Sequence, residues 1–325
     1  MSTTALPGWP REDEPFHAGE RELQARAGLR ERMAEIGARV IRDFMPDQHR
    51  ELFDKLPFFV VGSLDEKGRP WASLLTGAPG FVSTPDARLM HIDALPHPDD
   101  PLAAQLVPGA PLGLLGIELP TRRRNRMNGR VATLSARGFD VQVEQSFGNC
   151  PQYIQARSPF SVADMPRSVQ ARREDGLLSP RAQALVAEAD TFFIATAAEG
   201  GVDVSHRGGR PGFVRMQASG GRTVLTAPDF RGNFFFNTLG NIARHPRAGL
   251  LFVDFARGDL LMLTGDADMV WDGPEVEAFE GAQRLLRIEL SEGLWLEGGL
   301  PWEWSDAEPA PQLAHTGVWA NAASA

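Results

Sequence analysis

The sequence is short of several residue types and patterns on which common kinds of site depend. Its 325 residues include a single cysteine, Cys150, which excludes an intrachain disulfide and a cysteine-cluster metal site. It contains no apolar stretch long enough to span a bilayer, and no leader in which basic residues precede an apolar stretch and a cleavage site. We therefore expect a soluble cytoplasmic protein.

Positive charge is also scarce. Lys and Arg number 33 against 42 Asp and Glu, which gives a formal net charge of −9 at pH 7. Binding to nucleic acid or to anionic lipid needs a basic surface that releases counterions. The sequence therefore argues against nucleic-acid and membrane partners and favours a small-molecule substrate.

Three familiar chemical motifs are missing. The seven histidines are scattered without a His-Glu-x-x-His pair, so we expect no metal site. No Gly-x-Gly-x-x-Gly follows a strand pattern, so a nicotinamide would have to visit from solvent. Cys150 has no histidine and acid at a known spacing, so we expect a small buried apolar residue and not a nucleophile. The sequence names no catalytic residue.

The chain instead contains one long pattern twice. Residues 58–81 read FFVVGSLDEKGRPWASLLTGAPGF, and residues 192–213 read FFIATAAEGGVDVSHRGGRPGF. Later, LLGIEL at 114–119 matches LLFVDF at 250–255, and Gly129 matches Gly265. Self-similarity at this spacing indicates two duplicated domains, for which the chain is long enough.

Short β-branched or aromatic runs bounded by Gly, Pro and Asp predict a mainly β (α+β) fold. There are too few helical crossovers for a parallel sheet, so we expect antiparallel strands closed into two tandem barrels. The expected divisions are an N-terminal arm and helices (1–56), a first barrel with a degenerate cofactor site (57–156), a linker and helix (157–189), a second, cofactor-binding barrel (190–304) and a tail (305–325).

Three segments outside the repeat have a recognisable pattern. Residues 1–19 are rich in Pro, Gly and charge and predict a loose arm, and the spacing of the apolar residues after it predicts a helix that Pro46 ends. Asp47 can cap a short second helix, and Ser179 followed by Pro180 marks another helix start. Residues 278–304 predict a further helix and a closing strand.

The copies differ first in their second strand. When they are aligned on Pro-Gly-Phe, Ser205 matches Ser73, whereas three polar residues of the second copy match apolar ones of the first. These three are His206, Arg207 and Arg210, which match Leu74, Leu75 and Ala78. Such a cluster beside Gly-Gly suits a bound anion or a polar ring edge, although a solvated loop with surface arginines is the alternative.

A second difference lies at a short helix, expected at 237–246 in the second copy and at 99–108 in the first. The second copy begins it with Asn237 and Thr238, preceded by Arg231 and Asn233. Free backbone amides beside an arginine form a phosphate-binding arrangement. The first copy has two aspartates there, which would repel a phosphate, so we expect that its site is lost. The alternative is that Asn237 or Thr238 is an ordinary N-cap.

In the third difference, the positively charged residues are in the first copy. Arg122, Arg124 and Arg126 would share one face of a strand, where the second copy has mostly apolar residues at 256–262. Two barrels packed as a pseudo-twofold pair could place this arginine face over the anion site of the second copy. One composite site would result, and the equivalent location in the first copy would bind no ligand. A solvated basic patch is the alternative.

Several of these strings together resemble the pyridoxamine 5′-phosphate oxidase-like proteins, which have an FMN-binding split β-barrel. The strings are DTFFIATA, VDVSHRGGRPGFVRM, PDFRGNFFFNTLGNIARHPRAGLLFVDF and LMLTGDAD, and SFGNCPQYIQ at 146–155 looks like a signature of members with a tandem arrangement. The resemblance covers nearly everything from about residue 56 to the end.

The resemblance implies FMN at an interface between barrels, usually in a dimer. It implies that Ser205, His206 and Arg207 line the flavin, and that Arg124 lies near the position from which a partner barrel reaches it. It also implies a phosphate site made of Arg231, Asn233, Asn237 and Thr238. Asn-Thr departs from the Arg-Lys or Ser-Arg common at this helix start, so Arg231 or the arginines of the first copy would have to meet the phosphate charge. FMN is better supported than a vitamin B6 substrate.

Two functions remain open on the sequence. The first is an FMN-dependent oxidoreductase acting on an unidentified small molecule, with oxygen or a diffusible nicotinamide completing the cycle. The second is a non-catalytic flavin or haem carrier, with His206 or His245 as axial ligand. A third alternative is a scaffold protein in which neither location binds a ligand. The barrels could pair within one chain or across a homodimer.

Overall fold

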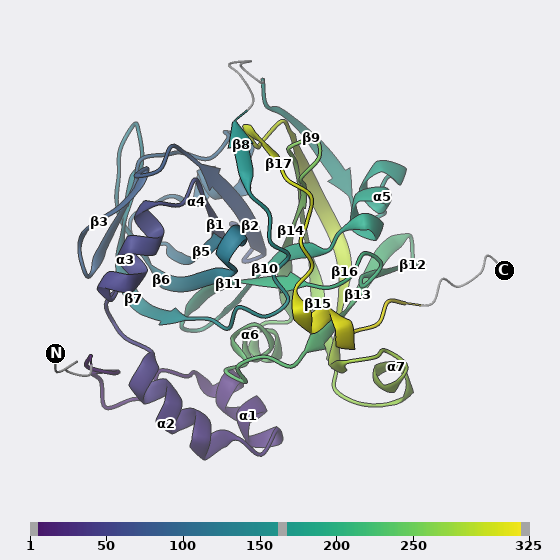
Figure 1. Cartoon of the computed structure of the whole chain (residues 1–325), viewed down its shortest axis with the longest axis horizontal. Helices are drawn as coiled ribbons and strands as arrows, with labels where there is room; N and C mark the ends of the chain where they lie inside the picture. Colours follow the sequence, from purple (N-terminus) through teal and green to yellow (C-terminus); the bar gives the residue numbers. More distant parts are fainter. Residues whose placement is uncertain (1–5, 162–167, 320–325) are drawn as a thin grey trace.

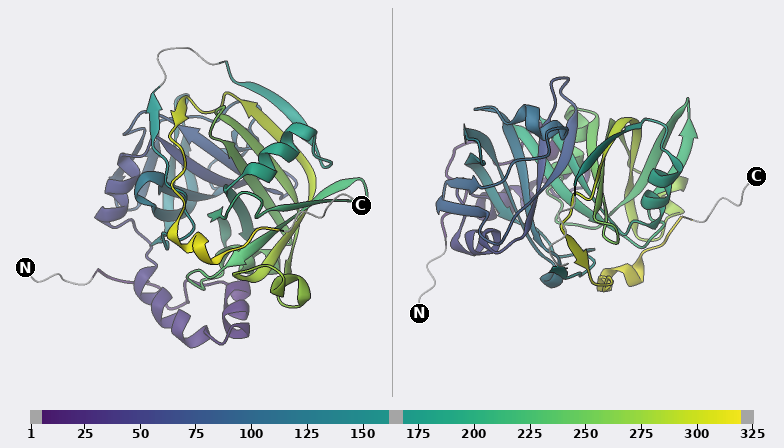
Figure 2. Two further views of the ribbon diagram at one scale, coloured as in Figure 1. Left: turned by 45° about the vertical axis from the view of Figure 1, so that its right-hand side comes forward. Right: turned by 90° about the horizontal axis from the view of Figure 1, so that it is seen from above.

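The computed structural model describes residues 6–161 and 168–319, and most of them lie in antiparallel strands. Two sheets stand side by side, and the helices are few and short (Figure 1 and Figure 2). The predicted mainly β fold is confirmed. No helix in these residues has the length and apolar character needed to cross a bilayer.

The two sheets have the same strand order, as the duplication predicts. The first runs β2-β1-β5-β6-β7-β4-β3 and the second β11-β10-β14-β15-β16-β13-β12, so each strand of the first has a counterpart nine places later. Each also has a register shift at the matched glycine, Gly129 in one and Gly265 in the other. Each sheet curves around its own apolar cluster, and we call these units the first and the second barrel.

The strands of the first barrel are β1 (Phe58–Leu64), β2 (Pro70–Thr76), β3 (Val82–Asp86), β4 (Leu89–Ile92), β5 (Pro111–Glu118), β6 (Arg123–Leu134) and β7 (Phe139–Gly148). Those of the second are β10 (Thr191–Ala198), β11 (Gly201–Gly208), β12 (Arg215–Ser219), β13 (Arg222–Phe230), β14 (Arg247–Asp254), β15 (Asp259–Val270) and β16 (Ala282–Glu297).

The remaining elements flank the barrels. They are helices α1 (Ala18–Arg26), α2 (Arg30–Val40), α3 (Asp47–Asp54), α4 (Pro101–Gln105), α5 (Pro180–Glu188), α6 (Asn237–Arg244) and α7 (Pro274–Glu277), the 3-10 turns η1 (Leu119–Thr121) and η2 (Pro311–His315), and strands β8 (Pro159–Ser161), β9 (Gln170–Asp175) and β17 (Trp302–Trp304).

Three segments differ from expectation. Part of the predicted loose arm is anchored, because Phe16 is 2% exposed and its ring packs edge-on against Phe235. Residues 278–304 contain the expected closing strand, but this strand, β16, is sixteen residues long and also takes the place of the expected helix, because pairing with both β13 and β15 outweighs the local helical pattern. The expected linker contributes β9, which pairs with the C-terminal part of β16 beyond the end of β13.

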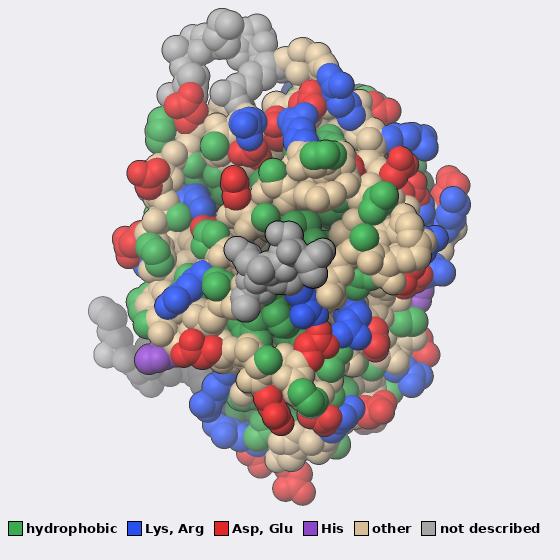
Figure 3. Space-filling view, turned by 90° about the vertical axis from the view of Figure 1, so that its right-hand side faces the viewer, with side chains coloured by type: hydrophobic (Ala, Val, Ile, Leu, Met, Phe, Trp, Pro, Cys, Tyr) green, Lys and Arg blue, Asp and Glu red, His purple; other side chains and the backbone are tan. Residues whose placement is uncertain are grey.

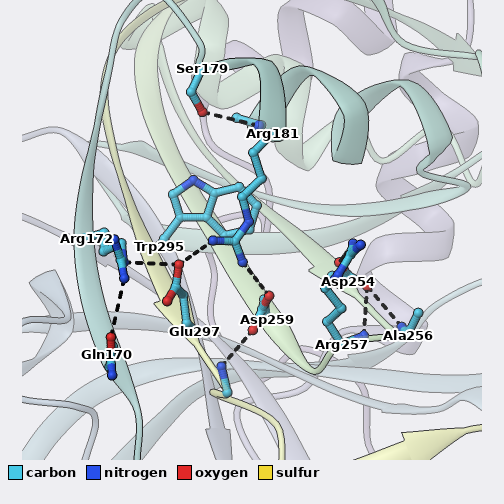
Figure 4. A network of polar contacts seen from close by, with 12 residues as sticks. Gln170, Arg172, Ser179, Arg181, Asp254, Ala256, Arg257, Asp259, Trp295 and Glu297 are labelled. Atoms are coloured by element: carbon cyan, nitrogen blue, oxygen red, sulfur yellow. Dashed lines mark hydrogen bonds and ion pairs between the residues drawn. The ribbon is translucent and has the colours of Figure 1, made fainter.

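Charged side chains fasten β9 and α5 to the second barrel (Figure 4). Arg181 of α5 pairs with Asp259 at 2.6 Å and with Glu297, and its guanidinium lies 4.4 Å from the ring centre of Trp295. Arg172 of β9 reaches the same Glu297 carboxylate at 3.2 Å. Basic and acidic side chains are likewise interspersed over the surface of this barrel in Figure 3.

The two barrels pack on each other within the chain. β2 of the first lies over β14 and β15 of the second, and β11 of the second lies over β5 and β6 of the first. A shared apolar cluster contains residues from both barrels, among them Trp71, Leu115 and Phe193. The contact is pseudo-twofold, because each barrel offers the same strands to the other.

The strands approach so closely because a glycine stands at the crossing on each side. A Cβ on Gly113 of β5 would lie 2.5 Å from the carbonyl oxygen of Val202, and a Cβ on Gly249 of β14 would lie 2.4 Å from that of Pro70. The four residues are matched positions of the two copies, so the same contact is made twice around the axis.

Adding a methyl group at this crossing tests its importance. Because the neighbouring atom is backbone and cannot rotate away, we expect Gly113→Ala to lower the free energy of unfolding by about 1–3 kcal/mol. Gly200→Ala is the matched control, since a Cβ there would meet nothing within 4 Å. Urea unfolding of both variants measures the effect. Equal stability of the two would show that the crossing has room to spare.

Candidate functional site

A partly open cleft of about 120 Å³ lies where β11 of the second barrel crosses β6 of the first. We call it the arginine cleft. It contains every residue that the sequence proposed for the cofactor except Arg122 and Arg210. The residues that line it are Leu115, Arg124, Arg126, Asn149, Cys150, Gln152, Tyr153, Ser205, His206, Arg207, Gly208, Pro228, Asp229, Phe230, Arg231, Gly232, Asn233, Phe234, Phe236, Asn237, Thr238, Leu239 and Arg284.

Alternate residues of β11 have different partners around the cleft. Thr238 of α6 donates a hydrogen bond of 3.1 Å from its hydroxyl to that of Ser205. Arg207 pairs with Asp229 of β13 at 2.6 Å, and the other oxygen of the same carboxylate accepts from Arg284 of β16 at 3.0 Å. One carboxylate therefore holds two guanidinium groups on the second-barrel side.

His206 lies between Ser205 and Arg207 in β11, and its side chain is buried. Its ring packs edge-on against Phe193 at a centroid distance of 5.7 Å. Within the described part of the chain, both ring nitrogens lack a hydrogen-bond partner and are shielded from solvent. Burial, together with the positive charges of Arg124 and Arg207, lowers the pKa of His206 well below 6.5. The imidazole is therefore neutral at physiological pH.

The first barrel contributes Arg124 and Arg126 from β6. Arg126 pairs with Asp203 at 3.0 Å and also donates to the Ser205 hydroxyl. Arg124 instead donates to two backbone carbonyls, that of Cys150 at 2.8 Å and that of His206 at 3.3 Å. Among the residues that the structure describes, none forms an ion pair with Arg124.

Arg124 is consequently a cation whose charge no neighbour balances. Burial and the like charges of Arg126 and Arg207 lower the pKa of Arg124 to about 9. A guanidinium in such surroundings gains most from an anion that it can reach with its free N–H groups. The electrostatics of the cleft therefore favour an anionic ligand.

The two predicted residues outside the cleft have clear structural reasons for their position. Arg122 precedes β6 and adopts a left-handed backbone with φ 58° at the end of η1, so it does not share a strand face with Arg124. Its side chain binds the carbonyl of Ile154 at 3.0 Å and the carboxylate of Glu308 at 2.9 Å. Arg210 lies exposed in the turn beyond the last residue of β11.

The start of α6 forms the opposite wall, and no side chain within residues 6–161 and 168–319 caps it. The N-cap is Phe236, with a left-handed φ of 64° and no capping oxygen. Asn237 donates its side-chain amide to Glu20 of α1, and the side-chain oxygen of Asn233 accepts from the amide of Phe235 at 3.2 Å. The first-turn amides of α6 thus lack the cap that Asn237 or Thr238 was an alternative candidate to provide.

The matched place in the first barrel is closed. Asp100, which aligns with Thr238, is the N-cap of α4, and its Oδ1 accepts from the Leu102 amide at 2.8 Å and from the Ser73 hydroxyl at 2.6 Å. Leu260 and Met262 stand where the other cleft has Arg124 and Arg126, and both belong to the apolar cluster between the barrels. An internal carboxylate and packed apolar side chains occupy this second location.

Aromatic rings line the outer part of the arginine cleft. Tyr153 stacks on Phe230 with centroids 5.0 Å apart and planes at 27°. The Arg284 guanidinium lies 5.0 Å from the Phe236 ring centre. The sequence gave no role to Asp229 or Arg284. Asp229 lies within the string PDFRGN, which was the available signal for it.

Comparison with known protein families finds a match within the second barrel. Residues 178–293, which include β10 to β15 and most of β16, match the family model for pyridoxamine 5′-phosphate oxidase. A search of curated proteins found no match.

Three solved structures are among those to which the chain is similar. HupZ from Group A Streptococcus is 15% identical over 35% of this chain and 90% of its own, with a TM-score of 0.29. A FAD-binding protein from Mesorhizobium loti is 12% identical over 39% and 97%, with a TM-score of 0.26. HutZ, the heme storage protein of Vibrio cholerae, is 17% identical over 38% and 96%, with a TM-score of 0.26.

The fold and the matched segment define a tandem split-barrel protein. The predicted resemblance to the pyridoxamine 5′-phosphate oxidase-like proteins is confirmed for the second barrel, to which the family model matches.

The closed location in the first barrel gives a pH prediction. Burial raises the pKa of Asp100 from 3.8 to about 6. The folded state therefore holds this proton more tightly than the unfolded one, and the stability that it contributes is lost as pH rises from about 4 through about 6.

Asp100→Asn removes this titration and keeps a capping side chain. We expect the free energy of unfolding of the wild type to fall by about 3 kcal/mol relative to this variant over that range. Urea unfolding at several pH values measures it, and Asp99→Asn, at an exposed neighbouring carboxylate, is the control. Parallel pH profiles for the wild type and Asp100→Asn would contradict the prediction.

Proposed function

We propose that this protein is an FMN-dependent oxidoreductase that binds one flavin in the arginine cleft and acts on a small molecule. One observation carries the proposal. The uncapped start of α6 faces Arg124, which has no acidic partner in the described chain, whereas the matched helix start of the first barrel is capped by its own Asp100. The cleft is thus built to receive an anionic group, which FMN provides as its phosphate.

The charges of the lining fit that group. Arginines 124, 126, 207, 231 and 284 face the cleft together with a single carboxylate, Asp229. Asp203, which pairs with Arg126, lies outside this lining. Positive charge therefore exceeds negative, although the chain as a whole carries −9. The enclosed volume of about 120 Å³ suits a phosphate and its immediate contacts, and a larger ligand would extend through the open side.

The residues of the cleft have separable roles in this proposal. Amides of the first turn of α6, with Thr238 and Arg231, would hold the phosphate. When bound, FMN would supply the capacity to accept and return a hydride. Arg124 and Arg207 would stabilise negative charge that develops near them, because they act from a partly buried position that needs no reorganisation. The stacked pair Tyr153 and Phe230 offers an apolar surface for a planar substrate and keeps water from it.

Haem is the weaker candidate for this cleft. An axial histidine must present a ring nitrogen to the iron, but both nitrogens of His206 are shielded. His245 is outside the lining of the cleft, and its Nε2 is hydrogen-bonded to the carbonyl of Gly68 at 2.8 Å. The two histidines that sequence reasoning offered are therefore poorly placed to bind iron.

Replacement of Arg124 tests the site. Arg124→Leu should raise the Kd for FMN about tenfold or more, because it removes a charge-assisted contact. The variant should fold, since Leu260 occupies the matched strand position of the second barrel. Arg123→Leu is the control, because Arg123 lies on the same strand but donates to the carbonyl of Gln48. Titration of FMN fluorescence gives both affinities. Equal Kd values for the two variants would contradict the assignment of the FMN site to the arginine cleft.

The absorption spectrum of purified protein tests the cofactor itself. We expect two flavin bands and release of about one FMN per chain on heating, because one of the two pseudo-equivalent locations is closed. Reduced nicotinamide followed under air and under nitrogen then tests for turnover. A sharp haem band would show that haem, and not FMN, is the ligand. A colourless protein that takes up no added FMN would overturn the proposal.

A further inference from the structure

The N-terminal helix α1 packs against α6 through two glycines. A Cβ on Gly19 would lie 2.2 Å from the carbonyl oxygen of Gly240, and a Cβ on Gly240 would lie 2.7 Å from the backbone nitrogen of Glu20. Figure 1 shows the two helices adjacent, below the barrels. Contact this close brings the side chains of α1 up to the loop before α6.

Two polar residues of α1 bind that loop and the helix start. Gln24 donates from its side-chain amide to the carbonyl of Phe235 at 3.2 Å. Glu20 is 3% exposed; its Oε1 accepts from the side-chain amide of Asn237, and its Oε2 accepts from the backbone of His17 at 2.8 Å. Phe235 and Asn237 flank Phe236, which lines the arginine cleft, so α1 holds the cleft wall from behind.

Glu20 also lines a second space. A cavity of about 480 Å³ lies between residues 9–21, the first barrel and the turn between β10 and β11, and we call it the N-terminal cavity. Its wall includes Glu20, Asp203 and Asn241. The pairs Glu20 with Asn237 and Asp203 with Arg126 each join a residue of this cavity to a residue of the arginine cleft. Glu20 therefore has a route for proton exchange on the side away from the cleft.

The charged groups around Glu20 come from several elements. Asp203 of β11 forms an ion pair with Arg126 of β6, while Arg244 of α6 packs against the backbone of Gly19. His17 lies 3.6 Å away, and burial lowers its pKa. Burial and the charge of Asp203 raise the pKa of Glu20 from 4.5 to about 8. Its carboxyl is therefore neutral at pH 7, beside the helix start that the anion would approach.

We propose that Glu20 is a positioning residue of the arginine cleft, and that binding of an anion in the cleft is linked to the proton that Glu20 carries. The identity of that anion as the FMN phosphate rests on the proposed function. A protonated Glu20 holds Asn237 without placing a negative charge behind the anion site. An ionised Glu20 keeps the hydrogen bond but repels the anion, so affinity falls as the proton leaves.

The first arm of the test needs no ligand. We compare hydrogen exchange of the backbone amides at 233–241 in Glu20→Ala and in Glu22→Ala, which alters an exposed residue of the same helix. Loss of the Asn237 contact should raise exchange in the first variant alone, with both variants retaining a cooperative thermal transition. Equal protection in the two would overturn the positioning role.

The second arm measures the proton linkage. The wild-type Kd for FMN should rise about tenfold between pH 7 and pH 9, as one proton is lost from a group with a pKa of about 8. The phosphate, whose second pKa is about 6, keeps its charge over this range. Glu20→Gln should show at most about a twofold rise, because its amide stays neutral and only Arg124, with a pKa of about 9, loses charge in this range. Glu22→Gln should follow the wild type. A wild-type slope that persists in Glu20→Gln would overturn the linkage.

Sulfate, whose charge is constant over the same range, separates this inference from the proposed function. If the wild type binds no FMN at any pH, the flavin proposal fails, and the exchange data together with a sulfate titration of the wild type, Glu20→Gln and Glu22→Gln still decide the role of Glu20. Sulfate affinity that falls with pH only when Glu20 is present would support the linkage. Sulfate affinity with the same pH profile in Glu20→Gln as in the wild type would overturn it.

Discussion

The close crossing of strands at Gly113 and Gly249 sets the position of everything around the cleft. With a glycine on each side, the backbone of one barrel meets the backbone of the other, so the two pack as a pseudo-twofold pair inside one chain. This contact carries Arg124 and Arg126 of the first barrel to the face of β11. A cleft made from both barrels follows from the crossing, since neither barrel alone contains its arginines and its helix start.

Symmetry in the backbone is combined with asymmetry in charge. At one of two equivalent places the chain gathers arginines around an uncapped helix start, and at the other it has Leu260, Met262 and the carboxylate of Asp100. Buried charge is costly unless it is paired. The closed place meets this constraint internally, by caps and apolar packing, and the open place leaves Arg124 without a counter-charge. The two copies therefore differ physically in one respect. The closed place is satisfied by groups of the protein, whereas the counter-charge for Arg124 at the open place would have to come from a ligand.

The internal repeat made much of this predictable. The equivalence of the two sheets, the helices α4 and α6, and the contrast between Asp100 and Thr238 all follow from matching one copy to the other. Residues that have no counterpart were harder. Glu20 lies in α1, just after an N-terminal arm that occurs once, and its contact with Asn237 spans 217 positions, which no local pattern reports. The polar composition of that arm predicted looseness, because composition does not reveal the single buried ring of Phe16.

Errors of register and backbone had a different origin. Arg122 fits a strand face by spacing alone, but η1 ends in a left-handed residue, and β6 begins one position later. Arg210 suits an anion site by residue type, but β11 ends at Gly208 and the chain turns away. Arg284 reaches the cleft because β16 pairs with β13 next to Asp229, a long-range pairing that the sequence did not disclose. Sequence spacing predicts the position of a residue correctly in the interior of an element but poorly at the ends of the element.

The covalent connection between the barrels has a consequence for behaviour on dilution. A site shared by two separate subunits falls apart when protein concentration drops below the dissociation constant of the dimer. Here the partner barrel is tethered, so its effective concentration is fixed by the linker and not by how much protein is present. The arginine cleft should therefore stay assembled in a cell that makes very few copies of this chain. The chain thus has one such cleft where a symmetric dimer would have two, but the assembly of that cleft does not depend on protein concentration.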